Sequence, residues 1–110
     1  MSVRERRIVL LELDNGRVPF EEWLESLRDK ALQRAVDARL ARVADGNFGD
    51  HKSVGNGVYE LRIPKGPGIR IYYGLKGEEI VVVIGGGDKS TQQKDITRAK
   101  ELWRKYSNEN

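Results

Sequence analysis

The segment from Val58 to Leu75 contains two runs in which apolar and polar residues alternate, and this alternation limits what the chain can fold into. Side chains of a β-strand point alternately to the two faces of a sheet, so each run is expected to form a strand with one apolar face. The runs Val58 to Ile63 and Ile69 to Leu75 are joined by Pro64 to Gly68, a connection rich in turn-forming residues. The sequence therefore predicts an antiparallel hairpin.

The apolar residues of this hairpin also predict which residues face each other, because a shift by one residue would turn a whole strand over. The register that matches the apolar residues of one face pairs Ile63 with Ile69, Leu61 with Ile71 and Tyr59 with Tyr73. The same register pairs Arg62 with Arg70 and Glu60 with Tyr72. Facing like charges destabilise a sheet by less than about 1 kcal/mol. Two interpretations remain open: Arg62 and Arg70 bind an anion such as phosphate, or Glu60 neutralises them in an ordinary network on a solvated face.

A third strand is predicted from Glu79 to Ile84, and it is apolar on both faces, as in a central or covered strand. Lys76-Gly77 predicts a two-residue hairpin connection to it. With that connection Arg70 lies opposite Val83, in the middle of the sheet. A cation in such a place is better explained by an anionic partner than by solubility.

One strand and two helices are predicted before the hairpin. The strand spans Arg4 to Leu13 and ends at the turn Asn15-Gly16. Pro19 suits the first position of a helix, and Asp29 can cap a second helix that Gly46 ends. The apolar stripes of these helices are Phe20, Trp23, Leu24 and Leu27 in the first, and Leu32, Val36, Leu40 and Val43 in the second. Asp45 to Gly57, with four glycines, is predicted to be a loop.

A last helix follows the segment Gly85 to Asp95, "GGGDKSTQQKD". Ser90 and Gln93 have the spacing of a capping box, and the apolar face consists of Ile96, Ala99, Trp103 and Tyr106. The element order β-α-α-β-β-β-α predicts a single α+β domain over residues 1–110. It would have two layers, a helix pair on a small antiparallel sheet with the last helix folding back, and a frayed tail at 107–110.

Composition excludes several functional classes. With no cysteine and one histidine, the chain has neither a disulfide framework nor the ligands of a structural zinc site. No apolar run is long enough for a transmembrane helix, and Glu12 and Asp14 interrupt the N-terminal apolar run, which argues against a signal peptide. The net charge of +3 is mildly basic. We therefore expect a cytoplasmic protein without membrane contact or cofactor.

Two further segments carry candidate site residues. The glycine-rich junction at Gly85 to Gly87, followed by Lys89, would leave N–H groups at a helix N-terminus for an anion, or would be only a flexible connection. His51 is either an exposed loop residue or a catalyst. Since no Ser-His-Asp set, cysteine nucleophile or metal cluster can be assembled, any chemistry must use Arg, Lys and carboxylates. Cleavage of RNA by its own 2′-hydroxyl fits that inventory.

Residues 46–102 resemble the RelE/HigB-type toxins of type II toxin–antitoxin modules, and most of all the phage-derived addiction module killer proteins. The motifs that carry the resemblance are "ELR", "GPGIRIYY" and "GGDKSTQQKDI" at these spacings, and the helical segment from Phe20 to Asn47 is similar as well. The resemblance implies a RelE/ParE-like fold and metal-independent cleavage of mRNA on the ribosome. It also implies inhibition by a cognate helix-turn-helix antitoxin.

The resemblance further implies roles for individual residues. Arg70 would contact the scissile phosphate, Arg62 would assist it, and Lys89 would act as a second cation or as the acid. Where some relatives have a catalytic Tyr or His, this chain has Lys94, Asp95 and Ile96, and where some have a lysine on the second strand it has Glu60. Glu60, His51 and Asp95, in that order, are the candidates for the base. The expected RNA-binding residues are Lys52, Lys65, Lys94 and Arg98.

Because the resemblance leaves the base open, two other functions stay in view. The chain could poison DNA gyrase without cleaving RNA, as the related ParE toxins do. It could also be a degenerate member of the family that retains only antitoxin binding.

Overall fold

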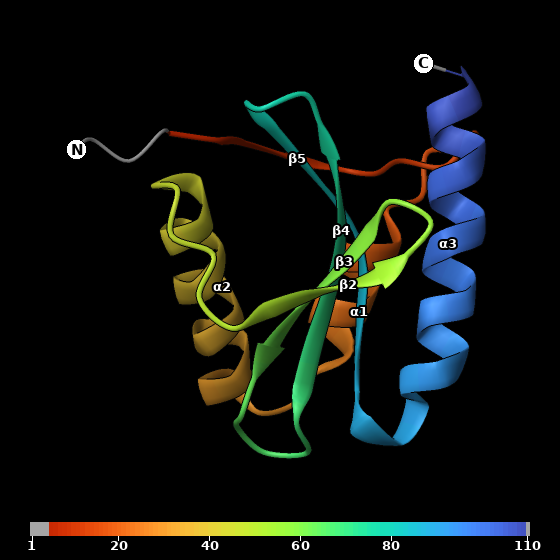
Figure 1. The fold of residues 1–110 in the computed structure, drawn as a ribbon. Coiled ribbons are helices and arrows are strands. Elements are labelled where there is room, and N and C mark those ends of the chain that lie inside the picture. The colour runs from red at the N-terminus through yellow and green to blue at the C-terminus, as the bar shows by residue number, and fades with distance from the viewer. Residues whose placement is uncertain (1–4, 110) are drawn as a thin grey trace.

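A mixed five-stranded β-sheet organises residues 5–109, the part of the chain that the computed structural model describes (Figure 1). The strand order is β1-β5-β4-β3-β2, with β1 parallel to β5 and the other neighbours antiparallel. The strands are β1 (Arg7–Leu10), β2 (His51–Gly55), β3 (Val58–Ile63), β4 (Ile69–Lys76) and β5 (Ile80–Asp88). The helices are α1 (Pro19–Ser26), α2 (Lys30–Ala44) and α3 (Gln92–Glu109), which a 3-10 turn (Lys89–Thr91) precedes.

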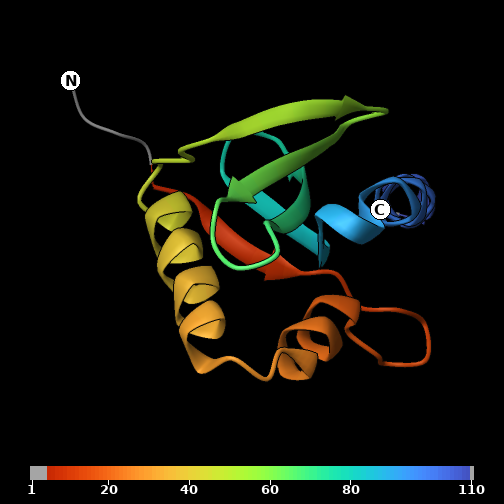
Figure 2. The ribbon, with the colours of Figure 1, turned by 90° about the horizontal axis from the view of Figure 1, so that it is seen from below.

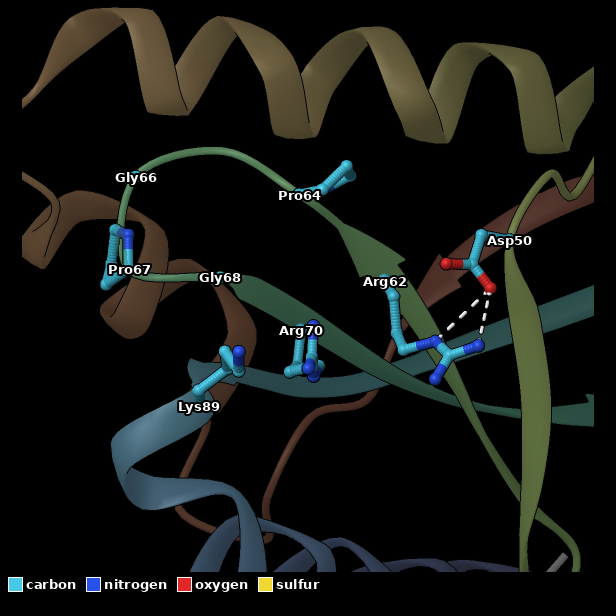
Figure 3. A pocket seen from close by; sticks show the side chains of 8 residues that line it. All are labelled: Asp50, Arg62, Pro64, Gly66, Pro67, Gly68, Arg70 and Lys89. Atoms are coloured by element: carbon cyan, nitrogen blue, oxygen red, sulfur yellow. Dashed lines mark hydrogen bonds and ion pairs between the residues drawn. The ribbon is translucent and has the colours of Figure 1, made fainter.

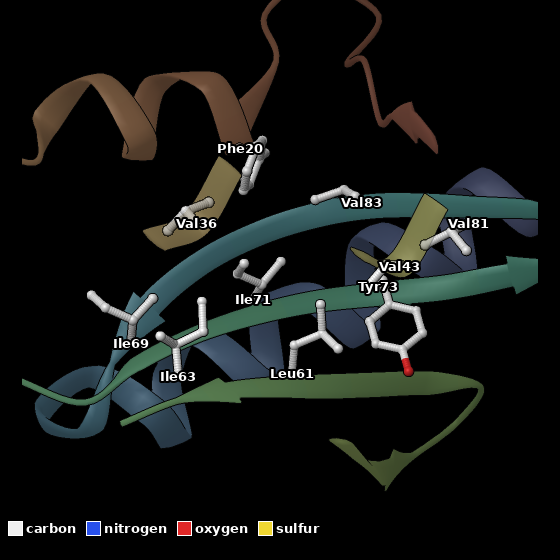
Figure 4. Packing of buried hydrophobic residues seen from close by; sticks show 10 residues of the cluster. All are labelled: Phe20, Val36, Val43, Leu61, Ile63, Ile69, Ile71, Tyr73, Val81 and Val83. Carbon is white, nitrogen blue, oxygen red and sulfur yellow. The ribbon is translucent and has the colours of Figure 1, made fainter. Parts of the chain in front are cut away.

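The two faces of the sheet are covered by different helices (Figure 2). The core under α1 and α2 (Figure 4) contains Phe20, Val36, Val43, Leu61, Ile63, Ile69, Ile71, Tyr73, Val81 and Val83. The core under α3 contains Leu11, Val58, Tyr72, Val82, Ile84 and Ala99, with Ile96, Trp103 and Tyr106 beside them. The α+β class and the predicted helix pair are confirmed. The last helix forms a third layer on the opposite face, because β5 is apolar on both sides.

The sheet contains one strand that the sequence analysis placed in a loop. Residues His51 to Gly55 form β2 and pair with β3 at the edge of the sheet. The tight turn after β2 uses left-handed backbone at Asn56 and Gly57, with φ of 57° and 81°. The expectation of a purely antiparallel sheet is also wrong, because β1 pairs parallel with β5. All four glycines of the segment have positive φ and made it look irregular, but none of them lies within the first four residues of β2.

The predicted register of the β3–β4 hairpin is confirmed at every pair, including Arg62 opposite Arg70 and Glu60 opposite Tyr72. The predicted register of β4 with β5 is wrong. Lys76 pairs with Ile80, so the connection has three residues, and an irregularity next to Tyr73 leaves one extra residue on β5. As a result Arg70 lies opposite Gly87 instead of Val83.

The glycine-rich junction is also different from the expectation, because Gly85, Gly86 and Gly87 belong to β5 and pair with β4. They are neither a flexible connection nor a loop around an anion. Their missing side chains let other groups lie on the sheet: a Cβ at Gly86 would overlap the ring of Trp23, and one at Gly87 would overlap the carboxylate of Asp95.

The observed helix ends match the sequence predictions only in part. Pro19 begins α1, and the Asp29 side chain accepts a hydrogen bond from the Ala31 N–H at the start of α2, as predicted. The cap of the last helical segment is Asp88 rather than Ser90, since the Asp88 carboxylate accepts the Ser90 N–H at 2.8 Å. Of the expected frayed tail, residues 107–109 are helical and residue 110 lies outside the described part, as does Arg4 of the first predicted strand.

Across residues 5–109, the helices are all too short or too polar to cross a lipid bilayer.

Candidate functional site

An open hollow of about 540 Å³ lies between the tip of the β3–β4 hairpin and the start of the last helical segment (Figure 3). Its lining is strongly cationic: the charged residues are three cations and one carboxylate. The lining residues are Asp50, Arg62, Pro64, Gly66, Pro67, Gly68, Arg70 and Lys89. Such a concave, cationic and solvent-open surface suits an anionic ligand.

The three cations come from three different elements that the fold brings together. Arg62 on β3 and Arg70 on β4 face each other across the hairpin, and strand alternation turns both toward the face that α3 covers. Lys89 directly follows β5 and packs its methylene chain against the hairpin loop. A Cβ at Gly68, where φ is +82°, would lie 2.6 Å from Lys89 Cδ. Only glycine therefore allows Lys89 to approach the loop this closely.

Arg62 is bound to Asp50, a residue that the sequence analysis did not single out. Arg62 Nη2 and Nε donate to Asp50 Oδ1 at 2.8 and 3.2 Å, and the Arg62 backbone N–H donates to the Asp50 carbonyl at 2.9 Å. The hydrogen bond from Arg62 lowers the pKa of the Asp50 carboxyl and raises the pKa of the Arg62 guanidinium. Recognising residues 51–55 as a strand would have revealed the pair, because its register with β3 brings Asp50 beside Arg62.

Arg70 forms its ion pair with a different carboxylate, that of Glu60, which lies deeper in the protein interior. Arg70 Nε is 3.9 Å from Glu60 Oε2, and the two side chains are 12% and 0% exposed. Gln92 Nε2, at the start of α3, donates to the same Glu60 oxygen at 2.8 Å. The sequence-predicted interaction between Glu60 and an arginine is therefore present, but in the interior rather than on a solvated face.

The Glu60 cluster contains polar atoms that are incompletely satisfied. Glu60 Oε1, Arg70 Nε and the Tyr72 hydroxyl are buried without a hydrogen-bond partner in the described part of the chain. Burial, followed by the nearby charge of Glu60 and that of Asp95, raises the pKa of Tyr72. A buried carboxylate with few hydrogen bonds holds its arginine mainly by charge.

The other predicted site residues do not line the hollow. Lys52 pairs with Glu60 across the sheet edge and is exposed, and Lys65 lies at the tip of the hairpin. Lys94 and Arg98 are exposed on the first half of α3. The carboxylate of Asp95 lies over Gly87 and accepts a hydrogen bond from the Thr91 hydroxyl.

His51 is not brought to the hollow. It pairs with Leu61, whose side chain lies in the core under α2, so His51 points to the face opposite the arginines. Its ring packs 5.5 Å from that of Phe48, and its Nδ1 lies 2.8 Å from the Gly49 carbonyl oxygen. Within residues 5–109, no group of three or more His, Cys, Asp or Glu side chains is arranged to hold a metal ion.

The structure thus defines a small α+β protein, compatible with a RelE-like fold, that has a cationic hollow at one end of its sheet. The chain belongs to the family described as "Phage derived protein Gp49-like (DUF891)", which matches residues 22–104 and is associated with addiction-module killer proteins. An uncharacterized protein of Haemophilus influenzae is 46% identical to it over 83 residues, which are 76% of this chain and 84% of that protein. The family match supports a toxin-like role.

Proposed function

We propose that this protein is the toxin of a type II toxin–antitoxin module and an endoribonuclease that cleaves mRNA on the ribosome without a metal. A cognate helix-turn-helix antitoxin would inhibit it in the cytoplasm. The observation that carries the proposal is the hollow in which Arg62, Arg70 and Lys89 converge. Membership of the Gp49-like family supports the toxin role, and the cationic hollow supports RNA as the target.

The geometry suits an attack by the RNA 2′-hydroxyl on the neighbouring phosphate. Charge-assisted hydrogen bonds from Arg70 and Lys89 would bind the phosphate and stabilise the negative charge that develops on it. Arg70 is well suited to this because Glu60 and the packing around it limit its movement before RNA binds. Lys89, which forms no ion pair within the described residues, would protonate the leaving 5′-oxygen. Exposed Lys52, Lys65, Lys94 and Arg98 would bind the flanking backbone.

The test is to express wild type, Arg70→Ala and a matched control from a tightly repressed promoter. Arg34→Ala is the control, because Arg34 is exposed on α2, away from the hollow. Wild type and the control should arrest growth and produce new 5′ ends in translated messages, as primer extension would show. Arg70→Ala should do neither, since one lost donor to the transition state lowers cleavage by about 10²–10³. Equal arrest and equal cleavage by Arg70→Ala would disprove the assignment.

A second candidate function is a ParE-like toxin that poisons DNA gyrase without cleaving RNA. The observation that favours it is the lining of the hollow, which includes neither a Tyr nor a His among the described residues. DNA breaks and SOS induction with intact mRNA would support this function over the nuclease. A degenerate protein that retains only antitoxin binding would cause no growth arrest at all.

A further inference from the structure

The nuclease proposal requires a general base that can reach the 2′-hydroxyl of RNA bound in the hollow. The three carboxylate or imidazole groups that the sequence suggested do not line it. Glu60 is 0% exposed and lies behind Arg70, and His51 is on the other face of the sheet. Asp95 is held by Thr91 above Gly87, in contact with the interior of the sheet.

Asp50 is the carboxylate that the described residues contribute to the lining of the hollow. Its side chain is 52% exposed, so a substrate can reach it. Both Arg62 nitrogens donate to one oxygen, Oδ1, while Oδ2 accepts no hydrogen bond from the described part of the chain. Figure 3 shows both interactions with Arg62 ending at the same Asp50 oxygen, while the second oxygen takes part in neither. Asp50 therefore presents a carboxylate oxygen that is held in place and available as an acceptor.

We infer that Asp50 is the general base of the cleavage reaction, an inference that rests on the proposed nuclease function. Asp50 Oδ2 takes the proton of the 2′-hydroxyl as the 2′-oxygen forms a bond to phosphorus. The bond from phosphorus to the 5′-oxygen breaks, and the 5′-oxygen takes a proton from the Lys89 ammonium. The products are a 2′,3′-cyclic phosphate and a free 5′-hydroxyl. Water then returns the proton from Asp50 to Lys89.

This assignment gives the two facing arginines different tasks. Arg70, held from behind by the buried Glu60, contacts the phosphate. Arg62 holds Asp50 in position through two hydrogen bonds to Oδ1. The charged groups that face Asp50 are Arg62 on β3, Arg70 on β4 and Arg39 on α2, and all are cations that lower its pKa.

The test of this inference compares Asp50→Asn with wild type, Asp50→Glu and Asp37→Asn. Asp37 is exposed on α2, so Asp37→Asn removes the same charge away from the hollow. Each protein is made by cell-free synthesis and added to a translation reaction that contains a reporter mRNA. The rate at which new 5′ ends appear is measured over a range of mRNA concentrations, and thermal unfolding shows whether each variant is folded. The 3′ ends are analysed for cyclic phosphate.

Asparagine keeps an oxygen that can accept from Arg62 but is a very weak base. Asp50→Asn should therefore lower the maximal cleavage rate by about 10²–10⁴ without weakening the apparent affinity for mRNA. Asp50→Glu should restore part of the rate, and Asp37→Asn should match wild type. These results, with cyclic phosphate ends, support the inference.

Three outcomes would overturn it. Folded Asp50→Asn that cleaves at the wild-type rate shows that Asp50 is not the base. A loss of mRNA affinity with an unchanged maximal rate shows that Asp50 only positions Arg62. If wild type cleaves no mRNA while it still arrests translation or growth, the proposed nuclease function fails, and the role of Asp50 fails with it.

Discussion

Replacing Glu60 by alanine should destabilise the protein strongly, because it leaves the largely buried Arg70 side chain without its counter-charge. In the native structure Glu60 is 0% exposed and lies 3.9 Å from Arg70 Nε. The change would also remove the acceptor that Gln92 uses. Solvent compensates little for the lost charge, since the Arg70 side chain is only 12% exposed and lies in a central strand of the sheet.

The size of the effect follows from this geometry. At an effective dielectric constant of about 20, two unit charges 3.9 Å apart attract by about 4 kcal/mol. Removing one partner of a buried pair typically costs about 3–5 kcal/mol, a large part of a total stability of about 5–15 kcal/mol. For 110 residues the unfolding entropy is about 0.23 kcal/mol per kelvin. A loss of about 3 kcal/mol therefore lowers Tm by about 13 °C.

Differential scanning calorimetry and urea unfolding of Glu60→Ala and Glu101→Ala would measure this effect. Glu101 is exposed on α3, and its removal should change stability by less than about 0.5 kcal/mol. A Tm of Glu60→Ala that equals that of Glu101→Ala would show that the Glu60–Arg70 pair does not stabilise the fold. The reasoning about a fixed Arg70 would then be wrong.

Three further predictions concern a helix cap, a sheet glycine and the buried tyrosines. Hydrogen bonds from Ser90 lower the pKa of Asp88, so the cap contributes stability above the unfolded-state pKa and loses it as pH falls through the folded value. Asp88→Ala should cost about 0.5–2 kcal/mol at neutral pH and less in acid, as urea unfolding at both pH values would show. A Cβ at Gly74 would lie 2.6 Å from the Trp103 ring, so Gly74→Ala should cost about 1–3 kcal/mol and change the near-UV circular dichroism. Burial raises the pKa of Tyr72 and Tyr73, so the stability they contribute is lost as pH rises, and absorbance titration should show both phenols ionising only as the protein unfolds.

Local patterns in the sequence predicted most elements because those elements are locally encoded. Pro19 suits the first position of its helix because it lacks an N–H, and Asp29 accepts a first-turn N–H of the next helix. The alternation in β3 and β4 allows one register that matches the apolar residues of the two strands on one face. That register follows from the sequence alone and is enough to put Arg62 opposite Arg70. The pairing of the two strands therefore depends on side chains that lie within a single hairpin.

The features that the sequence did not predict depend on contacts between distant segments of the chain. The one-residue irregularity in β5 beside Tyr73 and the edge strand β2 have no local signal, because they arise where several layers pack at once. For the same reason Gly86 and Gly87 looked like a loop, although they are strand residues under Trp23 and Asp95. Composition alone cannot distinguish a glycine that bends a chain from one that makes room for a neighbour.

The sequence by itself determined the α+β class, the hairpin register and the facing arginines, since short-range patterns in the chain encode them. Only the tertiary structure decided which carboxylate each arginine meets. β2 brings Asp50 to Arg62 at the surface, while α3 closes over Glu60 and buries it behind Arg70. Both carboxylates are close to an arginine, but solvent reaches only one of them. The physical reason is burial, which depends on how the layers pack.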